Sequence, residues 1–148
     1  MLMPVTIKLE CQIQKILLKM ITEISTYMVS MVLGIMLFFS FVVAPVTFTV
    51  LDEESSRKFI RKIFPYYYTV NLTVSFLILI FFVIQKTFSL NFYLILTVAI
   101  LFALSNYVLM PLINKYKDEN QDKKFKYSHF ISVIINFIQM IFLVIILI

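Results

Sequence analysis

Charged side chains are absent from four long apolar stretches of the chain. These stretches hold 28, 23, 28 and 22 residues and cover residues 24–51, 63–85, 87–114 and 127–148. A helix needs roughly 18 to 20 predominantly apolar residues to cross a bilayer. The pattern therefore predicts an all-α integral membrane protein, a four-helix bundle with spans at about residues 24–51, 66–85, 88–113 and 127–148.

The segment of residues 1–23, which precedes this domain of residues 24–148, has a different pattern. Apolar side chains recur every three or four positions, at Leu9, Ile13, Ile16, Leu17, Met20, Ile21 and Ile24. This spacing, with lysines on the other faces, predicts an amphipathic N-terminal helix. Because the polar face is basic and a span follows, we expect the helix to lie in the plane of the membrane interface. The alternative is a solvated amphipathic extension.

The first connection, residues 52–64, predicts a second interfacial helix that Asp52 caps. Its cations follow the acidic first turn, which suits the helix dipole, and we expect them to contact lipid headgroups: Arg57, Lys58, Arg61 and Lys62. Pro65 should then turn the chain into the second span. The connection around Lys86 is short, so the second and third spans should form an antiparallel hairpin. Residues 115–126 are charged and show no apolar period, which predicts a solvated loop.

The distribution of basic residues predicts the orientation of the chain. The first and third connections together hold nine Lys or Arg, whereas the other side holds Lys8, Lys15, Lys19 and Lys86. The positive-inside rule therefore places the long connections in the cytoplasm and both termini outside, and we expect a multi-pass protein of a bacterial inner (plasma) membrane. The ratio becomes nine to one if translation starts at Met20 rather than Met1. We expect no cleaved signal peptide.

Composition excludes several classes of protein. A single glycine, Gly34, excludes phosphate-cradling loops and dinucleotide fingerprints, and a single cysteine, Cys11, excludes paired-cysteine metal sites. The net charge of +5 comes from short segments between apolar stretches, which membrane topology explains better than nucleic-acid binding. The eight methionines include no dense repeat of the kind that binds Cu(I). We expect no enzyme, no cofactor, no metal site and no nucleic-acid partner.

Neutral polar side chains supply the candidate chemistry inside the spans. The set on the fourth span lies within an arc of about 80° and comprises His129, Ser132, Asn136 and Gln139. The second and third spans add Tyr67, Asn71 and Asn106. The first span offers a face of Ser30, Gly34, Phe41, Pro45 and Phe48. Either these faces pack the helices together through hydrogen bonds, or the polar groups form a site for a small polar ligand or ion.

Several segments resemble a known family. The stretch GIMLFFSFVVAPVTF at residues 34–48, followed by IFPYY at residues 63–67, resembles the start of a family of small four-span membrane proteins catalogued as a domain of unknown function and including transmembrane protein 205. Residues 106–111 and 125–132 resemble a later part of the same family. The resemblance covers about residues 28–140 and implies a four-helix membrane bundle with this pattern: Pro45, Phe64, Pro65, Tyr67, Asn106, Pro111, His129, Ser132 and Asn136. It implies no established reaction, although some bacterial relatives carry a copper-resistance label.

Two hypotheses about function follow. The first is a polytopic membrane protein that binds or passes a small solute or ion through a polar bundle centre. The alternative is a cofactor-free accessory or assembly subunit, whose polar faces pack its own helices, a second copy or a membrane-protein partner.

Overall fold

The computed structural model describes residues 5–148, with side chains from Leu9 onward, and all regular secondary structure in this range is helical. The elements are α1 (Val5–Phe38), the π-helical turn η1 (Phe39–Val43), α2 (Ala44–Val50), α3 (Glu53–Ile84), α4 (Leu90–Leu104), the π-helical turn η2 (Ser105–Leu109), α5 (Met110–Asp118) and α6 (Asp122–Leu147). The predicted all-α fold is confirmed.

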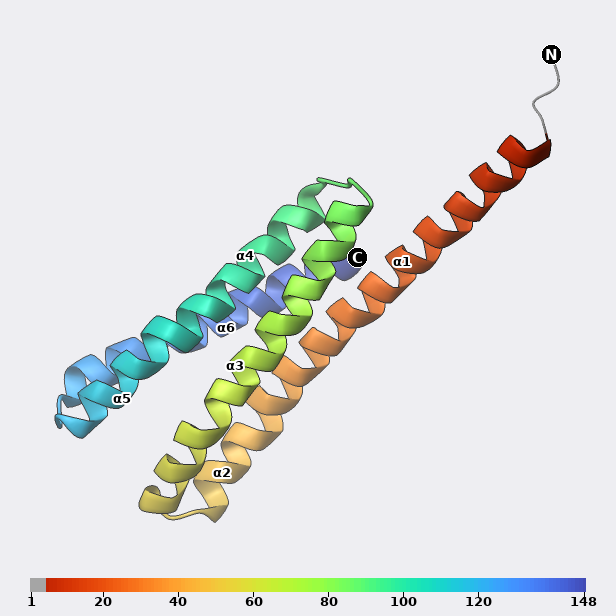
Figure 1. Ribbon diagram of the computed structural model, residues 1–148. Coiled ribbons are helices and arrows are strands. Elements are labelled where there is room, and N and C mark those ends of the chain that lie inside the picture. Colours follow the sequence, from red (N-terminus) through yellow and green to blue (C-terminus); the bar gives the residue numbers. More distant parts are fainter. Residues whose placement is uncertain (1–4) are drawn as a thin grey trace.

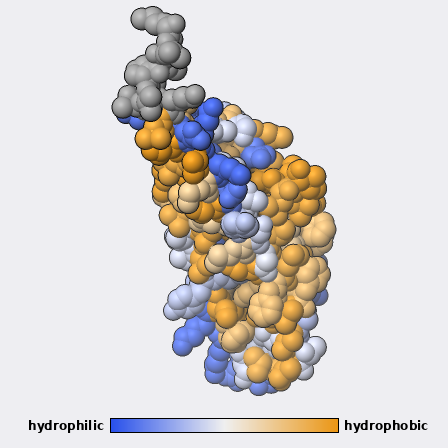
Figure 2. Space-filling model, turned by 90° about the vertical axis from the view of Figure 1, so that its right-hand side faces the viewer, coloured by the Kyte–Doolittle hydropathy of each residue, from blue (hydrophilic) through white to orange (hydrophobic). Residues whose placement is uncertain are grey.

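These elements join end to end into long apolar rods. Within the described residues, four of them are long and apolar enough to cross a membrane: Leu9–Val50, Glu53–Ile84, Leu90–Asp118 and Asp122–Leu147. Figure 2 shows the consequence on one face, where hydrophobic side chains cover most of the bundle and hydrophilic ones gather toward its ends. Four candidate spans were expected, and the chain is a multi-pass membrane protein by this pattern.

The four rods pack as a ring, so each has two neighbours. α1 packs on α3 and α6, and α4 also packs on α3 and α6, which leaves α3 and α6 on opposite corners (Figure 1). Large side chains from all four rods fill the centre of the described bundle, among them Val32, Met36, Ile78, Ile95, Phe102 and Leu143. Their burial orders the helices around one shared axis, because close packing drives helix association in lipid.

The N-terminal segment is helical, but it does not form a separate element. Val5–Phe38 is one helix, so no break divides the segment from the first span at residue 23 within the described chain. Its first half extends past the bundle (Figure 1) and leaves apolar side chains such as Leu9 and Ile16 exposed. This continuity favours the alternative of an amphipathic extension over a helix lying flat on the interface. Residues 1–4 lie outside the described range.

The expected turn at Pro65 is wrong, because α3 runs through it. A helix of 32 residues reaches roughly 48 Å, well beyond the hydrocarbon thickness of about 30 Å. The first connection is therefore the projecting start of the second span. A proline inside a helix removes one hydrogen bond and costs about 3 kcal/mol. Neighbouring side chains hold the helix together here, since Phe64 packs edge-on against Phe39 with ring centroids 5.1 Å apart.

The start of α3 agrees with its sequence signals. The side chain of Asp52 accepts a hydrogen bond of 2.9 Å from the backbone N–H of Ser55, as predicted for a cap. That hydrogen bond favours the charged carboxylate and lowers the pKa of Asp52. Ser56 is buried, and its hydroxyl donates to the carbonyl oxygens of Thr47 and Leu51. The chain reversal between α2 and α3 is thus fixed from both sides.

The loop predicted at residues 115–126 is also wrong. α5 continues to Asp118 and α6 begins at Asp122, so the connection consists of residues 119–121, with Asn120 at a positive φ of 55°. Charge placement stabilises both helix ends, because lysines occupy the last turn of α5 and an aspartate the first turn of α6. The hairpin around Lys86 is confirmed by the short gap between α3 and α4.

Each π-helical turn immediately precedes a proline. Pro45 follows η1 and Pro111 follows η2 by the same two residues. A proline lacks an N–H for the carbonyl four residues earlier and its ring clashes with that group. The carbonyls in question belong to Phe41 and Tyr107, the middle residues of the two π turns. The wider turn therefore admits each proline without ending the helix.

Candidate functional site

A chain of hydrogen bonds joins three rods near the middle of the bundle. The hydroxyl of Tyr67 on α3 donates to Asn136 Oδ1 on α6 over 2.9 Å, and Asn136 Nδ2 donates to Ser40 Oγ in η1 over 3.1 Å. We call these three residues the Asn136 bridge. Since α3 and α6 occupy opposite corners, the Tyr67–Asn136 hydrogen bond crosses the bundle, whereas the Asn136–Ser40 hydrogen bond joins two neighbouring rods.

Aromatic rings hold the Tyr67 end of the bridge in place. Phe39 lies 4.3 Å from the Tyr67 ring and Tyr68 lies 5.1 Å from it, measured between centroids. Phe102 from α4 approaches edge-on at 6.4 Å. Tyr67 is 6% exposed, so its hydroxyl is fixed in direction by packing as well as by its acceptor.

A cavity of about 630 Å³ adjoins the bridge and extends to the α2–α3 end of the bundle. We call it the basic cavity. Its walls are mainly apolar and include Phe48, Leu51, Ile60, Phe64, Met110, Ile113, Phe125 and Val133. All three residues of the Asn136 bridge line it, as do Ser132 and His129. The exposed side chains Glu53 and Arg57 line the other end, so the cavity opens to the surface there.

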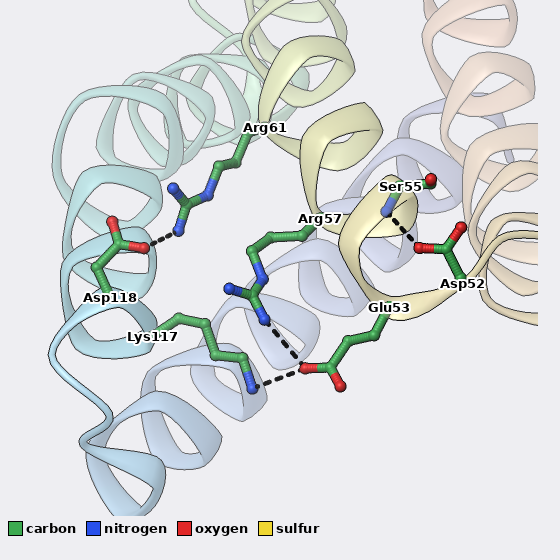
Figure 3. A network of polar contacts seen from close by, with 7 residues as sticks. All are labelled: Asp52, Glu53, Ser55, Arg57, Arg61, Lys117 and Asp118. Carbon is green, nitrogen blue, oxygen red and sulfur yellow. Dashed lines mark hydrogen bonds and ion pairs between the residues drawn. The ribbon is translucent and has the colours of Figure 1, made fainter.

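Cations surround the open end. Among the described residues that line the basic cavity, the cations are Arg57, Arg61 and Lys117. Arg57 lies 3.1 Å and Lys117 3.5 Å from the same carboxylate oxygen of Glu53, and Arg61 pairs with Asp118 on α5 (Figure 3). Over residues 52–64 and 115–126, which supply these pairs, nine basic side chains outnumber six acidic ones, so this end of the bundle carries a net positive charge. Partly exposed ion pairs of this kind contribute little to the stability of the fold. We therefore consider what these cations can bind at the mouth of the basic cavity.

Arg61 has further capacity to bind. Its side chain is about one-third exposed, yet Nε is buried and has no hydrogen-bond partner among residues 9–148. Buried donors in folded proteins are nearly always satisfied, so an orphaned one calls for a partner such as water or a ligand. The nearby ring of Phe125 stacks on His129 at 6.0 Å, and Lys117 lies over the Phe125 ring at 5.2 Å.

The structure divides the predicted site residues into two groups. Tyr67, His129, Ser132 and Asn136 line the basic cavity together. The other three do not line it: Asn71 donates to the backbone oxygen of Tyr67 within α3, Gln139 donates to Val98 O on α4, and Asn106 donates to Thr69 Oγ1 on α3. Asn71 and Gln139 are fully buried, and each keeps an oxygen without a partner among the described residues. The candidate site is therefore smaller than the predicted polar face.

The four cations predicted to contact headgroups also divide. Arg57 and Arg61 line the basic cavity, whereas Lys62 does not and remains exposed. Lys58 is likewise exposed and pairs with Glu54 over 2.7 Å. Positions four residues apart share a helix face, which explains this division. Contact of Lys58 and Lys62 with headgroups stays a prediction.

The face predicted for the first span is wrong for four of its five residues, and only Phe48 lines the basic cavity. Ser30, Gly34, Phe41 and Pro45 are exposed, while Val29, Val32 and Met36 are buried. Small and polar residues misled the interpretation, because a serine hydroxyl can bond to its own helix, as Ser30 does with Thr26 O at 3.0 Å. The sequence did not predict Ser40 as a site residue, because a serine in a helix gives no sign of a partner on another helix. Its role follows only from the hydrogen bond that it accepts from Asn136. Lys117 was missed because the sequence predicted a loop there.

One family model matches this chain. Residues 27–122 match a family described as a domain of unknown function, DUF4149. The chain belongs to this family. The matched segment holds η1, α3 and α5, which supply three walls of the basic cavity, and it ends at the first residue of α6. Comparisons with curated proteins and with solved structures give no match. The residues the structure describes hold no group of three or more His, Cys, Asp or Glu arranged to bind a metal ion.

Proposed function

We propose that this membrane protein binds a small solute or ion at the polar centre of its bundle. The observation that carries the proposal is the meeting of the Asn136 bridge with a cavity of about 630 Å³ that opens among charged side chains. Ligand sites are typically cavities of this size, with apolar walls and a few polar groups in fixed positions. The proposal assigns no reaction and no cofactor to the chain.

The polar groups are suited to binding because their orientation is already set. Tyr67 and Ser40 hold the amide of Asn136 from both sides, so a ligand meets a pre-arranged donor and acceptor array. Pre-organised groups lose little entropy when they bind. Passage across the membrane is a further part of the proposal. It needs the Asn136 bridge to open, because these hydrogen bonds join α3, α6 and η1 beside the basic cavity.

Topology and relationship are proposed on the same basis. The nine basic residues within residues 52–64 and 115–126 support a cytoplasmic location for the open end of the basic cavity, in a bacterial inner membrane. The likeness of residues 34–48 and 63–67 to the transmembrane-protein-205-like family supports a relationship within the wider set of small four-span proteins.

A second candidate is an accessory or assembly subunit. The apolar stripe of α1 that continues past the bundle supports it, since Leu9, Ile13 and Leu17 are more than half exposed. A membrane-protein partner or a second copy would cover such a stripe. Co-purification of a larger complex that is lost when Ile13 and Leu17 are replaced by serine would favour this candidate.

Native mass spectrometry of protein extracted in mild detergent tests the proposed function. We expect a stoichiometric small-molecule adduct on the wild type and on Phe137→Leu, whose side chain is 60% exposed beside the bridge. Asn136→Leu should lose the adduct while retaining the helical circular-dichroism spectrum. Wild-type protein that carries no adduct under conditions where it stays folded would contradict the proposal.

A further inference from the structure

We infer that the basic cavity binds an anionic amphiphile, a molecule that joins one phosphate or carboxylate head to an apolar tail. This inference rests on the proposed function and specifies its ligand class. Three observations carry it: the chemistry of the walls, the charge at the open end, and the position of that end along α3.

The walls are suited to an apolar tail. Between the cations and the Asn136 bridge, the lining consists largely of aromatic and aliphatic side chains, such as Phe64, Met110 and Val133. A small hydrated ion would gain nothing from these surfaces, whereas an alkyl chain gains roughly 0.8 kcal/mol for each CH₂ that is buried. The space of about 630 Å³ accommodates a chain of lipid-like thickness.

The open end is suited to an anionic head. Arg57, Arg61 and Lys117 share Glu53 and Asp118, at an end of the bundle where nine basic side chains outnumber six acidic ones. Arg61 Nε is a buried donor without a partner among the described residues, and it belongs to a residue that lines the basic cavity. Guanidinium groups bind phosphate and carboxylate through paired hydrogen bonds. Binding of an anion there satisfies the orphaned donor and offsets part of the excess positive charge.

The position of the cations agrees with this arrangement. They lie in the part of α3 that projects beyond the length needed to cross the hydrocarbon, and on α5 beside it (Figure 3). The head would thus lie at the membrane interface and the tail would point toward the bundle centre, the orientation that an amphiphile already has in a bilayer. Such a ligand could enter from the bilayer with its charged head still at the interface and its tail still in an apolar environment.

Binding of matched probes to the full-length protein in dodecyl maltoside tests the inference. The probes are dodecyl phosphate, dodecyltrimethylammonium and inorganic phosphate, with Kd measured by native mass spectrometry. We expect dodecyl phosphate to bind at least tenfold more tightly than either of the other two. Equal binding of the two dodecyl compounds would overturn the anionic head, and equal binding of inorganic phosphate would overturn the tail.

Two variants separate binding from structural support. Arg61→Gln and Asp118→Asn each break the same ion pair, so a purely structural role predicts equal effects on dodecyl phosphate. A binding role predicts opposite effects: Arg61→Gln should weaken binding at least tenfold, whereas Asp118→Asn frees the guanidinium and should tighten binding several-fold. Lys62→Gln, which removes a cation from the outer face of α3, is the charge-matched control and should change Kd less than twofold. Equal effects of the first two variants would overturn the inference.

The source of the anion is distinguished in nanodiscs. If phosphatidic acid at 10 mol % in phosphatidylcholine displaces dodecyl phosphate, the natural ligand is a membrane lipid; if it does not, the ligand is a soluble amphiphile. Both results support the shared chemistry. The proposed function is tested separately, by the loss of the native adduct in Asn136→Leu. If that adduct is lost while dodecyl phosphate binds no more tightly than dodecyltrimethylammonium, this inference is overturned and the proposed function stands.

Discussion

The hydroxyl of Tyr67 lies 2.9 Å from Oδ1 of Asn136, although the two residues belong to helices on opposite corners of the bundle. Both residues line the basic cavity. A hydrogen bond of this kind fixes the distance between two helices that do not pack directly along their lengths. It therefore contributes to the shape of the site as well as to the stability of the fold.

The first prediction concerns the energy of this contact. Asn136→Leu should lower the free energy of unfolding by about 1 kcal/mol, since hydrogen bonds between membrane helices contribute about that much. Phe137→Leu should cost less, because the Phe137 side chain faces outward and is 60% exposed. Unfolding in mixed micelles with increasing sodium dodecyl sulfate measures both. Adding Tyr67→Phe to Asn136→Leu should cost less than Tyr67→Phe in the wild type; full additivity would show that the two residues are not coupled.

The second prediction concerns η1 and Pro45. Pro45→Ala restores an N–H that can bond to the carbonyl of Phe41, which allows η1 to return to an α-helical turn. The change in register should rotate Ser40 away from Asn136. Ser40→Ala should therefore destabilise the wild type but have little effect in the Pro45→Ala background. An undiminished effect of Ser40→Ala in that background would show that the proline does not cause the π turn.

The third prediction concerns the capping carboxylate of Asp52. Its pKa is lowered below the ordinary value of 3.8 by the hydrogen bond from Ser55, so its contribution to stability is present above pH 3.8. That contribution is lost as the pH falls through the lower pKa of the folded state. Asp52→Ala should consequently reduce Tm at pH 7, with a difference that shrinks below about pH 4. Asp52→Asn keeps a neutral capping acceptor and should show a smaller pH dependence; a constant difference between Asp52→Ala and the wild type would contradict this account.

The fourth prediction concerns orientation. An impermeant thiol reagent added to intact cells should label Cys11, which is exposed, because the basic residues place both termini outside. In a Cys11→Ser background, Asn120→Cys in the turn between α5 and α6 should resist labelling until the cells are lysed. The reverse pattern would invert the orientation and place the open end of the basic cavity outside.

Apolar length alone predicts the four spans, because the bilayer demands long uncharged helices whatever the detail of the sequence. The ends of the helices are less predictable. Residues 53–62 predict a separate interfacial helix and residues 115–118 predict part of a loop, but both segments are continuous with the long helices α3 and α5. Pro45, Pro65 and Pro111 would stop a helix in water, whereas in lipid an open backbone is so costly that the helix continues around them.

The candidate site is predictable to the extent that helical spacing determines which side chains share a face. His129, Ser132 and Asn136 follow from that spacing, and the structure places all three on the basic cavity. Gln139 shares the same arc but lies deeper, where it bonds to Val98 O and serves packing. Asn106 lies in the π-helical turn η2 and does not line the basic cavity. Lys117 does line it, because α5 packs on α6. These relationships depend on contacts between distant residues, which one sequence does not encode locally.

Photo-crosslinking tests the central claim, that a ligand occupies the basic cavity against the Asn136 bridge. A dodecyl phosphate with a diazirine at the end of its tail would be irradiated with the protein in nanodiscs, and the labelled peptides would be sequenced by mass spectrometry. The account predicts labels concentrated near Tyr67 and Ser40, where the end of the tail meets the Asn136 bridge, and their loss in Arg61→Gln but not in Lys62→Gln. Labels confined to the outer residues Phe76 and Phe137, and unchanged by Arg61→Gln, would contradict it.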